Sequence, residues 1–429
     1  MDATVVAPGA VQTLPESCTS YGLNVVGFVC FLTVSLILRD FRGLSQNTLT
    51  LVSLSAIALP LMAMELVQRR AYARESSGLD FAAGNAVDWA RVAVKLFGFT
   101  MTFAIIALLY WVLPEYHRDF YAPFWQLLKV ALPLVLLAAI PYFIFVDRIM
   151  RDPCDGYWHC GMALLGRGKH VDGQMLVQYA LGWLVKAFFI PLMILMYMRS
   201  YQYFLGVNFA GMISSTRNIY NFFYEFSYLV DLLFACVGYV LTVRLLDTHI
   251  RSTEPSVKGW VVALACYEPF WALTYGTFLA YNTDNFAWGN WLEGYPVIYA
   301  LWAATILVFL ALYAASTVSF GLRFSNLTHR GILTNGPYRF CKHPAYVSKN
   351  ISWWLVAVPF IAEAGALDAL RDCALLLGVN AIYYLRARTE ERHLSWDPVY
   401  RQYALAMNER SIFRGVAKWL PFLRYRAEA

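Results

Sequence analysis

Long apolar stretches alternate with short polar ones along almost the whole chain. A stretch of about 20 predominantly apolar residues is long enough to cross the hydrocarbon core of a bilayer as a helix. The pattern therefore predicts an all-α protein, a polytopic transmembrane helical bundle of about ten spans. The expected spans lie near residues 20–38, 47–66, 92–113, 126–146, 176–198, 220–243, 259–281, 295–322, 345–362 and 367–386.

The last two apolar stretches differ from the others because only the short linker "IAEAGALDALRD" separates them, which predicts a tight helical hairpin. The tail after the hairpin alternates charged residues with aromatic and aliphatic ones. This pattern predicts a helix followed by segments that lie on the membrane surface. We expect residues 1–205 to form N-terminal transmembrane helices of unassigned role. Residues 206–429 would form a catalytic membrane domain with the hairpin and the interfacial tail.

Composition agrees with a membrane protein. Hydrophobic residues make up 59% of the chain and charged residues 14%, whereas soluble domains contain about 25% charged residues. A transmembrane barrel would show alternating segments of about ten residues instead. The net charge of +6 is spread over loops, which suits membrane topology and anionic lipid and indicates no nucleic-acid partner. The eight Cys lie mostly in apolar stretches, so no disulfide framework is expected.

The distribution of Lys and Arg among the loops predicts an orientation. With ten spans, the loops on the side of both termini are richer in Lys and Arg than the opposite loops, and cytoplasmic loops carry this excess. We therefore expect both termini in the cytoplasm of a multi-pass protein of a bacterial inner membrane or an equivalent membrane. Residues 1–20 contain Asp2 and Glu16 but no Lys or Arg, so no cleavable signal peptide is expected.

Two polar clusters flank the expected hairpin at its cytoplasmic end. The first is "GPYRFCKHPAYVSKN" at residues 336–350, and the second is "RARTEERHL" at residues 386–394. Because a two-helix hairpin brings its two open ends together, the clusters should be neighbours. The sequence thus predicts cations, carboxylates, an imidazole and aromatic rings at one membrane surface.

These two clusters resemble a known family. "GPYRFCKHPAYVS" is similar to the G-x-Y-x-x-x-R-H-P-x-Y-x-G pattern of isoprenylcysteine carboxyl methyltransferases and their bacterial relatives. "EERHLSWDPVYRQY" is similar to the E-E-x-x-L…Y-x-x-Y segment that follows the hairpin in that family. The resemblance covers roughly residues 300–425, and the first five or six spans show no comparable match.

The resemblance implies S-adenosylmethionine as the cofactor and a lipid-borne or other amphipathic methyl acceptor that enters from the bilayer. Carboxylates would hold the ribose or the ammonium group, and His343, Tyr346 and backbone donors near 336–338 would hold the cofactor's carboxylate. Aromatic faces of Tyr338 and Tyr403 would stack on adenine or attract the sulfonium. The candidate catalytic residues are Lys342 and Arg339, and no metal is needed. The candidate cofactor-binding residues are Tyr338, His343, Pro344, Tyr346, Glu390, Glu391 and Tyr403.

The sequence departs from the family pattern at two positions. Lys342 stands where the family usually has Arg, and Ser348 stands where Gly is usual. The usual Arg is placed to pair with the acceptor's anionic group, and an ammonium does not replace a planar bidentate fork. These departures argue against a prenylcysteine carboxylate as the acceptor.

Other functions fit parts of the same pattern. An NADPH-dependent membrane reductase of the sterol-reductase type would use Arg386, Arg388 and Arg392 for the phosphates of its cofactor. A transporter would show internal repeats and interrupted helices in paired positions, and no convincing repeat is present. A basic loop that only fixes topology would explain Arg339, Lys342 and Lys349, but not the His343–Tyr346 motif or the paired glutamates.

Several polar residues lie in or near apolar stretches, where ionisable groups normally face a partner or a wet cavity. We expect structural pairing, with Lys186 bound to Glu225 or Asp231. The segment "DPCDGYWHCG" brings Cys154, His159 and Cys160 together, but its spacing is not a familiar zinc pattern, so an interfacial loop is expected. Residues 244–260 could form one wall of the cofactor site, a role for which only their location on the same side of the membrane argues. The sequence predicts no oligomeric state.

Overall fold

The structure is a computed structural model that describes residues 13–41, 43–82, 86–282 and 287–426. These residues are largely helical, and their one sheet pairs β1 (Ser252–Thr253) antiparallel with β2 (Thr328–His329). The chain divides into two compact units. The N-terminal unit comprises Gly22–Glu268 with Phe320–Arg330, and the C-terminal unit comprises Met1–Tyr21, Pro269–Ser319 and Gly331–Ala429. The functional boundary expected at residue 206 stays a prediction.

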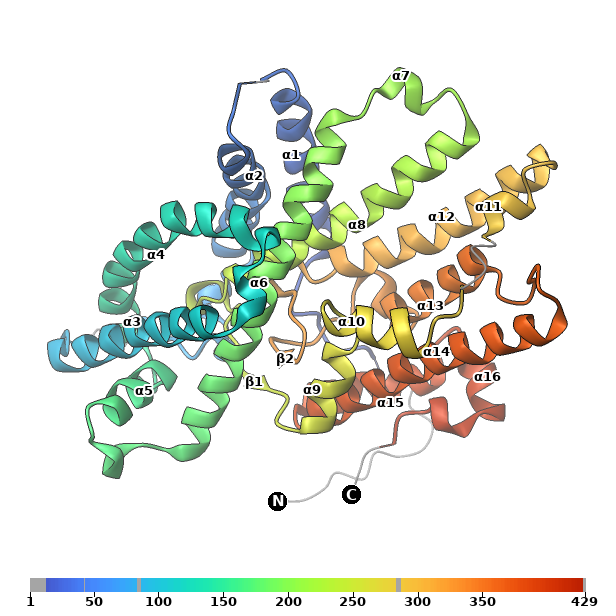
Figure 1. Ribbon diagram of the computed structural model, residues 1–429. Helices are drawn as coiled ribbons and strands as arrows, with labels where there is room; N and C mark the ends of the chain where they lie inside the picture. Colours follow the sequence, from blue (N-terminus) through green and yellow to red (C-terminus); the bar gives the residue numbers. More distant parts are fainter. Residues whose placement is uncertain (1–12, 42, 83–85, 283–286, 427–429) are drawn as a thin grey trace. The chain divides into compact units, whose positions relative to one another are not determined.

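Long apolar helices build the N-terminal unit, and polar residues directly before them cap their first turns, as at Asp88, Asp172 and Ser215. Short turns and the two strands join the helices (Figure 1). The helices are α1 (Tyr21–Leu38), α2 (Gln46–Val67), α3 (Trp89–Val112), α4 (Ala122–Ile149), α5 (Gly156–Leu164), α6 (Gly173–Gly206), α7 (Phe209–Met212), α8 (Thr216–Val240) and α9 (Val257–Leu264).

The C-terminal unit is built around a long helix and the hairpin. The 3₁₀ turn η9 (Gly336–Arg339) precedes the hairpin, and the tail follows it as two helices and a last turn. The helices are α10 (Phe270–Leu273), the π-helical η7 (Thr274–Phe278), α11 (Trp288–Trp291), α12 (Pro296–Val318), α13 (Pro344–Ala357), α14 (Ala366–Leu394), α15 (Pro398–Arg410) and α16 (Arg414–Trp419).

Seven helices among the described residues are long and apolar enough to cross a membrane: Tyr21–Leu38, Gln46–Val67, Trp89–Val112, Asp119–Ile149, Gly173–Gly206, Thr216–Val240 and Pro296–Val318. They indicate an integral membrane protein, and each coincides with an expected span. The other three expected spans do not qualify, so a total of ten is not confirmed. Residues 259–281 break into short pieces around Pro269, and α13 has only 14 residues. Arg371, Asp372 and Arg386 interrupt the apolar pattern of α14.

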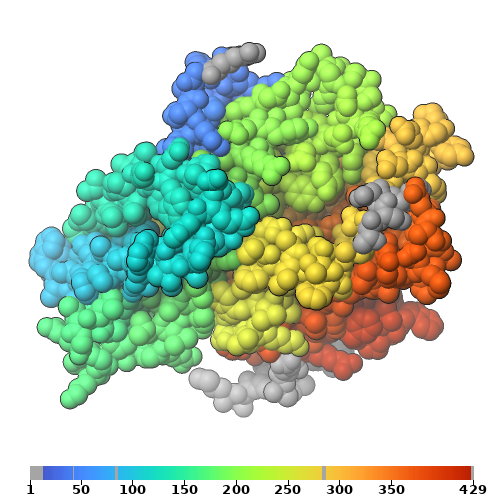
Figure 2. All heavy atoms as spheres, viewed as in Figure 1, coloured from blue at the N-terminus to red at the C-terminus, as the bar shows by residue number. Residues whose placement is uncertain are grey.

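Two glycines let α3 and α5 touch backbone to backbone. A Cβ atom added at Gly98 would lie 2.3 Å from the carbonyl oxygen of Tyr157, and one at Gly161 would lie 2.3 Å from that of Val94. Small residues at such crossings allow helices to approach closely in membranes. In the space-filling view, the atoms of α3 (light blue) and α5 (green) accordingly lie against each other (Figure 2).

The loop that leads into the hairpin is fixed by the start of the chain. The backbone of Cys18 donates a hydrogen bond to the carbonyl of Ile332, and Thr334 donates its hydroxyl to the carbonyl of Pro15. Gly336 follows with a φ of +53°, and a Cβ there would lie 2.5 Å from the hydroxyl of Ser319. Only glycine fits this position without strain, so η9 starts at a defined place and direction.

Candidate functional site

The open end of the α13–α14 hairpin brings the two polar clusters together. Trp354 Nε1 donates to Asn380 Oδ1 (2.7 Å), Tyr346 OH donates to Glu390 Oε2 (2.8 Å), and His343 Nε2 lies 3.1 Å from Glu391 Oε1. Residues nearer the start of α13 contact residues nearer the end of α14, as in an antiparallel pair of helices. Residues about fifty positions apart in sequence therefore face each other, as the hairpin pattern predicted.

Glu391 is the centre of this cluster. The residue is 4% exposed, and its carboxylate contacts two cationic side chains and one imidazole. Oε1 lies 2.6 Å from Lys342 Nζ and 3.1 Å from His343 Nε2, and Oε2 accepts a hydrogen bond of 2.8 Å from Arg388 Nη1. Burial alone would raise the pKa of Glu391, but the hydrogen bond from His343 and the charges of His343 and Lys342 lower it to about 2. The residue is therefore an anion at every physiological pH.

Aromatic rings cover the neighbouring surface of the hairpin. The rings of His343 and Tyr346 stack with an interplanar angle of 3°, and Tyr383 meets Tyr346 edge to face. The guanidinium of Arg386 lies 5.1 Å from the centroid of the Tyr346 ring. This contact fixes Tyr346, whose hydroxyl already binds Glu390. Arg386 thus covers one face of the Tyr346 ring and helps to hold that ring in place.

Tyr403 holds the loop that carries the first cluster. Its side chain is 2% exposed and packs in a hydrophobic cluster with Ile332, Tyr400 and Met407. Its hydroxyl donates to the carbonyl of Tyr338 (2.8 Å). Burial raises the pKa of Tyr403 well above its usual value, so the hydroxyl stays a donor. Tyr338 itself lies half-buried in η9.

The remaining predicted site residues are distributed around this core. Pro344 is buried at the first turn of α13, where proline suits the helix start. Ser348, at the usual glycine position, turns its hydroxyl onto the carbonyl of Pro344 (2.8 Å). Arg339 is exposed and makes no ion pair or side-chain hydrogen bond within the described part of the chain.

Lys342 is partly free despite its charged neighbour. The ammonium nitrogen is buried and lies 2.6 Å from Glu391 Oε1, which engages one of its three N–H donors. The same nitrogen lies 5.6 Å from the centroid of the Tyr425 ring. Lys342 therefore keeps N–H donors for a further anion.

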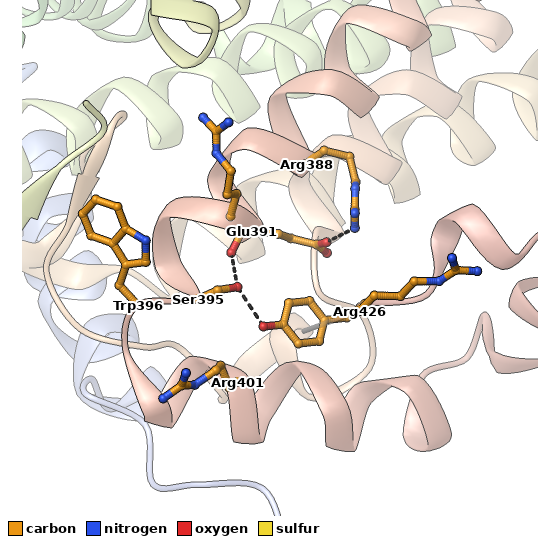
Figure 3. A pocket seen from close by; sticks show the side chains of 8 residues that line it. Arg388, Glu391, Ser395, Trp396, Arg401 and Arg426 are labelled. Carbon is orange, nitrogen blue, oxygen red and sulfur yellow. Dashed lines mark hydrogen bonds and ion pairs between the residues drawn. The ribbon is translucent and has the colours of Figure 1, made fainter. Parts of the chain in front are cut away.

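A cavity of about 380 Å³ borders Glu391 on the side of Arg388. Figure 3 shows Arg388 and Glu391 approaching it from α14 and Arg401 from α15. Sequence reasoning missed most of its lining, because the tail was interpreted only as an interfacial segment. The lining residues are Arg388, Glu391, Arg392, Ser395, Trp396, Arg401, Tyr425 and Arg426.

A second group of aromatic rings in the C-terminal unit also escaped the sequence analysis. The ammonium of Lys349 lies 5.5 Å from the ring centroids of both Tyr313 and Trp353, and 5.9 Å from that of Tyr383. Such contacts are cation–π attractions. Lys349 therefore joins α12 to the hairpin.

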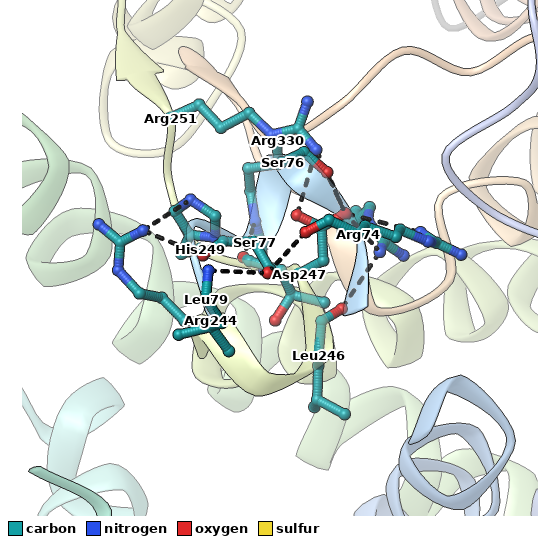
Figure 4. A network of polar contacts seen from close by, with 12 residues as sticks. Arg74, Ser76, Ser77, Leu79, Arg244, Leu246, Asp247, His249, Arg251 and Arg330 are labelled. Carbon is teal, nitrogen blue, oxygen red and sulfur yellow. Dashed lines mark hydrogen bonds and ion pairs between the residues drawn. The ribbon is translucent and has the colours of Figure 1, made fainter. Parts of the chain in front are cut away.

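The N-terminal unit has its own polar network around Asp247 (Figure 4). Asp247 contacts Arg74 (3.6 Å), Arg251 (3.2 Å) and Arg323 (3.7 Å), and Glu65 lies 3.4 Å from Arg323. Burial, and then the surrounding arginines, lower the pKa of His249 well below 6.5. Because Glu65 pairs with Arg323, it is a structural ion-pair partner. The expected role of residues 244–260 as a wall of the cofactor site stays a prediction.

The expected partner of Lys186 is wrong. Its ammonium group contacts the hydroxyl of Thr242 and lies 4.4 Å from the ring of Trp183, and it forms no ion pair with Glu225 or Asp231. The Lys186 side chain extends from α6 toward Thr242, which lies just after the end of α8.

The cysteine and histidine side chains of residues 154–160 contact other groups. His159 Nδ1 accepts from the backbone of Asp172 (3.2 Å), and Cys160 is buried against Thr102. Within the described ranges, no three His, Cys, Asp or Glu side chains are grouped so that they could hold a metal ion.

Comparison with known proteins gives two matches. Residues 297–396 match the isoprenylcysteine carboxyl methyltransferase (ICMT) family, which confirms the resemblance for a segment that includes α12, α13 and α14. The match ends before Tyr403. This segment is therefore similar to a family of membrane methyltransferases.

The chain is also similar to the cobalt-zinc-cadmium resistance protein CzcN of Cupriavidus metallidurans, with 27% identity over 128 residues. The aligned part is 28% of this chain and 56% of CzcN, so the chain spans about half the length of that curated relative. No solved structure matches the chain.

Proposed function

We propose that this protein transfers a methyl group from S-adenosylmethionine to a lipid-borne or other amphipathic acceptor at the cytoplasmic face of a bacterial inner membrane or an equivalent membrane. One observation carries the proposal. The hairpin joins His343 to Glu391 and Tyr346 to Glu390, and all four residues lie in the segment that matches the methyltransferase family.

The chemistry of these side chains suits the cofactor, which carries a carboxylate, an ammonium, a ribose and a sulfonium. Glu390 and the anionic Glu391 provide acceptors for ammonium or ribose hydroxyl groups. The stacked rings of His343 and Tyr346 offer a face to a cation or to adenine. The glutamates and the stacked rings therefore suit the cationic groups and the ribose of the cofactor. Lys342, although buried, keeps donors for the anionic group of the acceptor.

When bound, S-adenosylmethionine supplies an electrophilic methyl group. The protein's task is to align the acceptor atom with that methyl and to exclude water. Glu390, Glu391, His343 and Tyr346 would orient the cofactor, and Tyr403 would hold η9 and Tyr338 in place. Lys342, with Arg339 nearby in sequence, would pair with the acceptor's anionic group.

A membrane reductase is the second candidate, and the cavity supports it. Arg388 and Arg392 line the cavity, where they could pair with the phosphates of NADPH. Arg386, the third arginine expected for this role, instead covers the rings of Tyr346 and Tyr383.

Isothermal titration of the purified full chain separates the candidates. We expect binding of S-adenosylmethionine and of its demethylated product, and no binding of NADPH. Glu390→Ala, Glu391→Ala and His343→Ala, each made separately, should weaken S-adenosylmethionine by about tenfold or more, as expected when a hydrogen bond to a charged group is lost. Glu409→Ala is the matched control, because Glu409 is an exposed tail carboxylate paired only with Arg424. Binding of NADPH alone would sink the proposal.

A further inference from the structure

The cavity beside Glu391 has a strong excess of positive charge. Four guanidinium groups line it, from Arg388, Arg392, Arg401 and Arg426, and Glu391 is the one carboxylate among its lining residues. Arg388 already pairs with Glu391. The side chains of Arg401 and Arg426 make no ion pair or hydrogen bond within the described residues. The charges of Arg401 and Arg426 therefore have no counterpart in the lining.

The lining favours one class of anion. Arginine binds phosphate oxygens through two parallel N–H donors, and several such forks around one space suit a group with three or four oxygens. Ser395 and Tyr425 add hydroxyl groups, which hydrogen-bond to each other at 2.8 Å. A volume of about 380 Å³ falls within the usual range of small-molecule sites. It exceeds what a bare phosphate fills and suits a phosphate ester.

The cavity and the hairpin cluster share a wall. Glu391 turns Oε1 toward Lys342 and His343, and it turns Oε2 toward Arg388 at the cavity. Tyr425 lines the cavity and also lies beside Lys342 Nζ. A ligand with its phosphate among the arginines would therefore reach the methyl-transfer cluster with a group only a few bonds away.

We propose that this cavity binds the phosphate of a phosphate ester, and that a heteroatom of this ester is the methyl acceptor. The second half of this statement rests on the proposed function. The bond from that atom to the methyl carbon would form as the carbon–sulfur bond of S-adenosylmethionine breaks. The demethylated cofactor would leave as a neutral thioether, and a proton on the acceptor atom would pass to solvent. Arg401 and Arg426 act as phosphate-binding residues, and Lys342 contacts the same molecule from the cluster side. The phosphate belongs either to a lipid headgroup or to a soluble ester, two sources with the same binding chemistry.

Titration of the full chain in non-ionic detergent tests the binding site. The probes are inorganic phosphate, glycerol 3-phosphate and dihexanoyl phosphatidic acid, with hexanoate as a carboxylate control. We expect the phosphate esters to bind and hexanoate not to bind. The double variant Arg401→Ala/Arg426→Ala should weaken the esters by about tenfold or more, the loss of charge-assisted hydrogen bonds. Arg410→Ala is the matched control, since Arg410 lies exposed at the other end of α15 and outside the cavity.

Each outcome has a clear meaning. Tighter binding of phosphatidic acid than of glycerol 3-phosphate assigns the site to lipid headgroups, and equal binding assigns it to soluble esters. Unchanged affinity in the double variant, or equal binding of hexanoate, overturns the phosphate site. Affinity for S-adenosylmethionine should be the same in wild type and double variant. If the wild type binds the phosphate esters but not S-adenosylmethionine, the proposed function is refuted and the phosphate site is still supported.

Discussion

Two buried carboxylates, Glu391 in the C-terminal unit and Asp147 in the N-terminal unit, each bind more than one cation. Asp147 is 2% exposed, binds Arg91 through 2.7 and 2.9 Å contacts, and lies 2.8 Å from Lys95, which is fully buried. Asp155 adds a second carboxylate 3.8 Å from Lys95. In that cluster, two buried acids face two bases, and Arg91 also pairs with the exposed carboxylate of Asp88 (3.0 Å), so each cation has a carboxylate partner within the protein.

In the Glu391 cluster, one carboxylate contacts Lys342, Arg388 and the imidazole of His343, and it borders a cavity with further arginines. This comparison distinguishes an ion cluster that only stabilises the fold from one that could bind a ligand. Burial and ion pairing are common to both, so neither feature indicates function. An excess of one charge beside a space that a ligand can enter favours a binding site, because a bound anion would supply the missing counter-charge.

The largest expected effect breaks the balanced cluster. Lys95→Met should destabilise the protein by about 3–5 kcal/mol, because it leaves two carboxylates buried without their shared base. The midpoint of thermal unfolding in detergent measures this. Lys169→Met, in an exposed loop turn, is the control and should change little. The affinity of folded Lys95→Met for S-adenosylmethionine should be unchanged, and a loss there would place Asp147 in the functional machinery.

The next effect concerns pH and Glu391. Its pKa falls from 4.5 to about 2 on folding, so its stabilisation is complete above about pH 4.5 and is lost as the pH falls toward 2. The contribution amounts to about 3 kcal/mol. Unfolding measured between these pH values should show a slope that Glu391→Gln reduces. An identical slope in both proteins would mean that the carboxylate is not held by its cations.

A smaller effect concerns the role of Lys342. Lys342→Ala should lower the turnover of methyl transfer by about tenfold, or 1.4 kcal/mol of barrier, while the affinity for S-adenosylmethionine changes much less. The reason is that, in the proposed function, its remaining donors would bind the acceptor. Steady-state kinetics and titration of the same preparation measure both quantities. Equal losses in turnover and in cofactor affinity would refute the acceptor-side role.

The smallest effect comes from the support of the cluster. Tyr403→Phe removes the hydroxyl that binds the carbonyl of Tyr338 and should cost about 1 kcal/mol of stability. Cofactor affinity should fall slightly, because η9 loses a fixed point. Thermal unfolding and titration measure the two effects. Tyr384→Phe, which removes a similar bond to the carbonyl of Phe422, is the control with no change in cofactor affinity.

Much of the candidate site could be predicted from the sequence. Seven of the expected spans and the neighbouring ends of the hairpin follow from local apolar patterns, because helix length and a short linker are properties of adjacent residues. The pairing of His343 and Tyr346 with the two glutamates follows from the same hairpin. What failed was the continuity of residues 259–281, since an averaged apolar pattern does not register the break around Pro269.

The amino-acid pattern alone was enough to predict a helical membrane protein with a charged hairpin end that resembles one methyltransferase family. Which charged side chains have an oppositely charged partner could be seen only in the folded structure. It placed Asp147 against Lys95 and left Arg401 and Arg426 around a cavity. It also fixed the loop before Gly336 with residues 15–19, some three hundred positions away. The reason is that charge balance and cavity shape depend on side chains that folding brings together. Contacts between residues so far apart in the chain cannot be predicted from local sequence patterns.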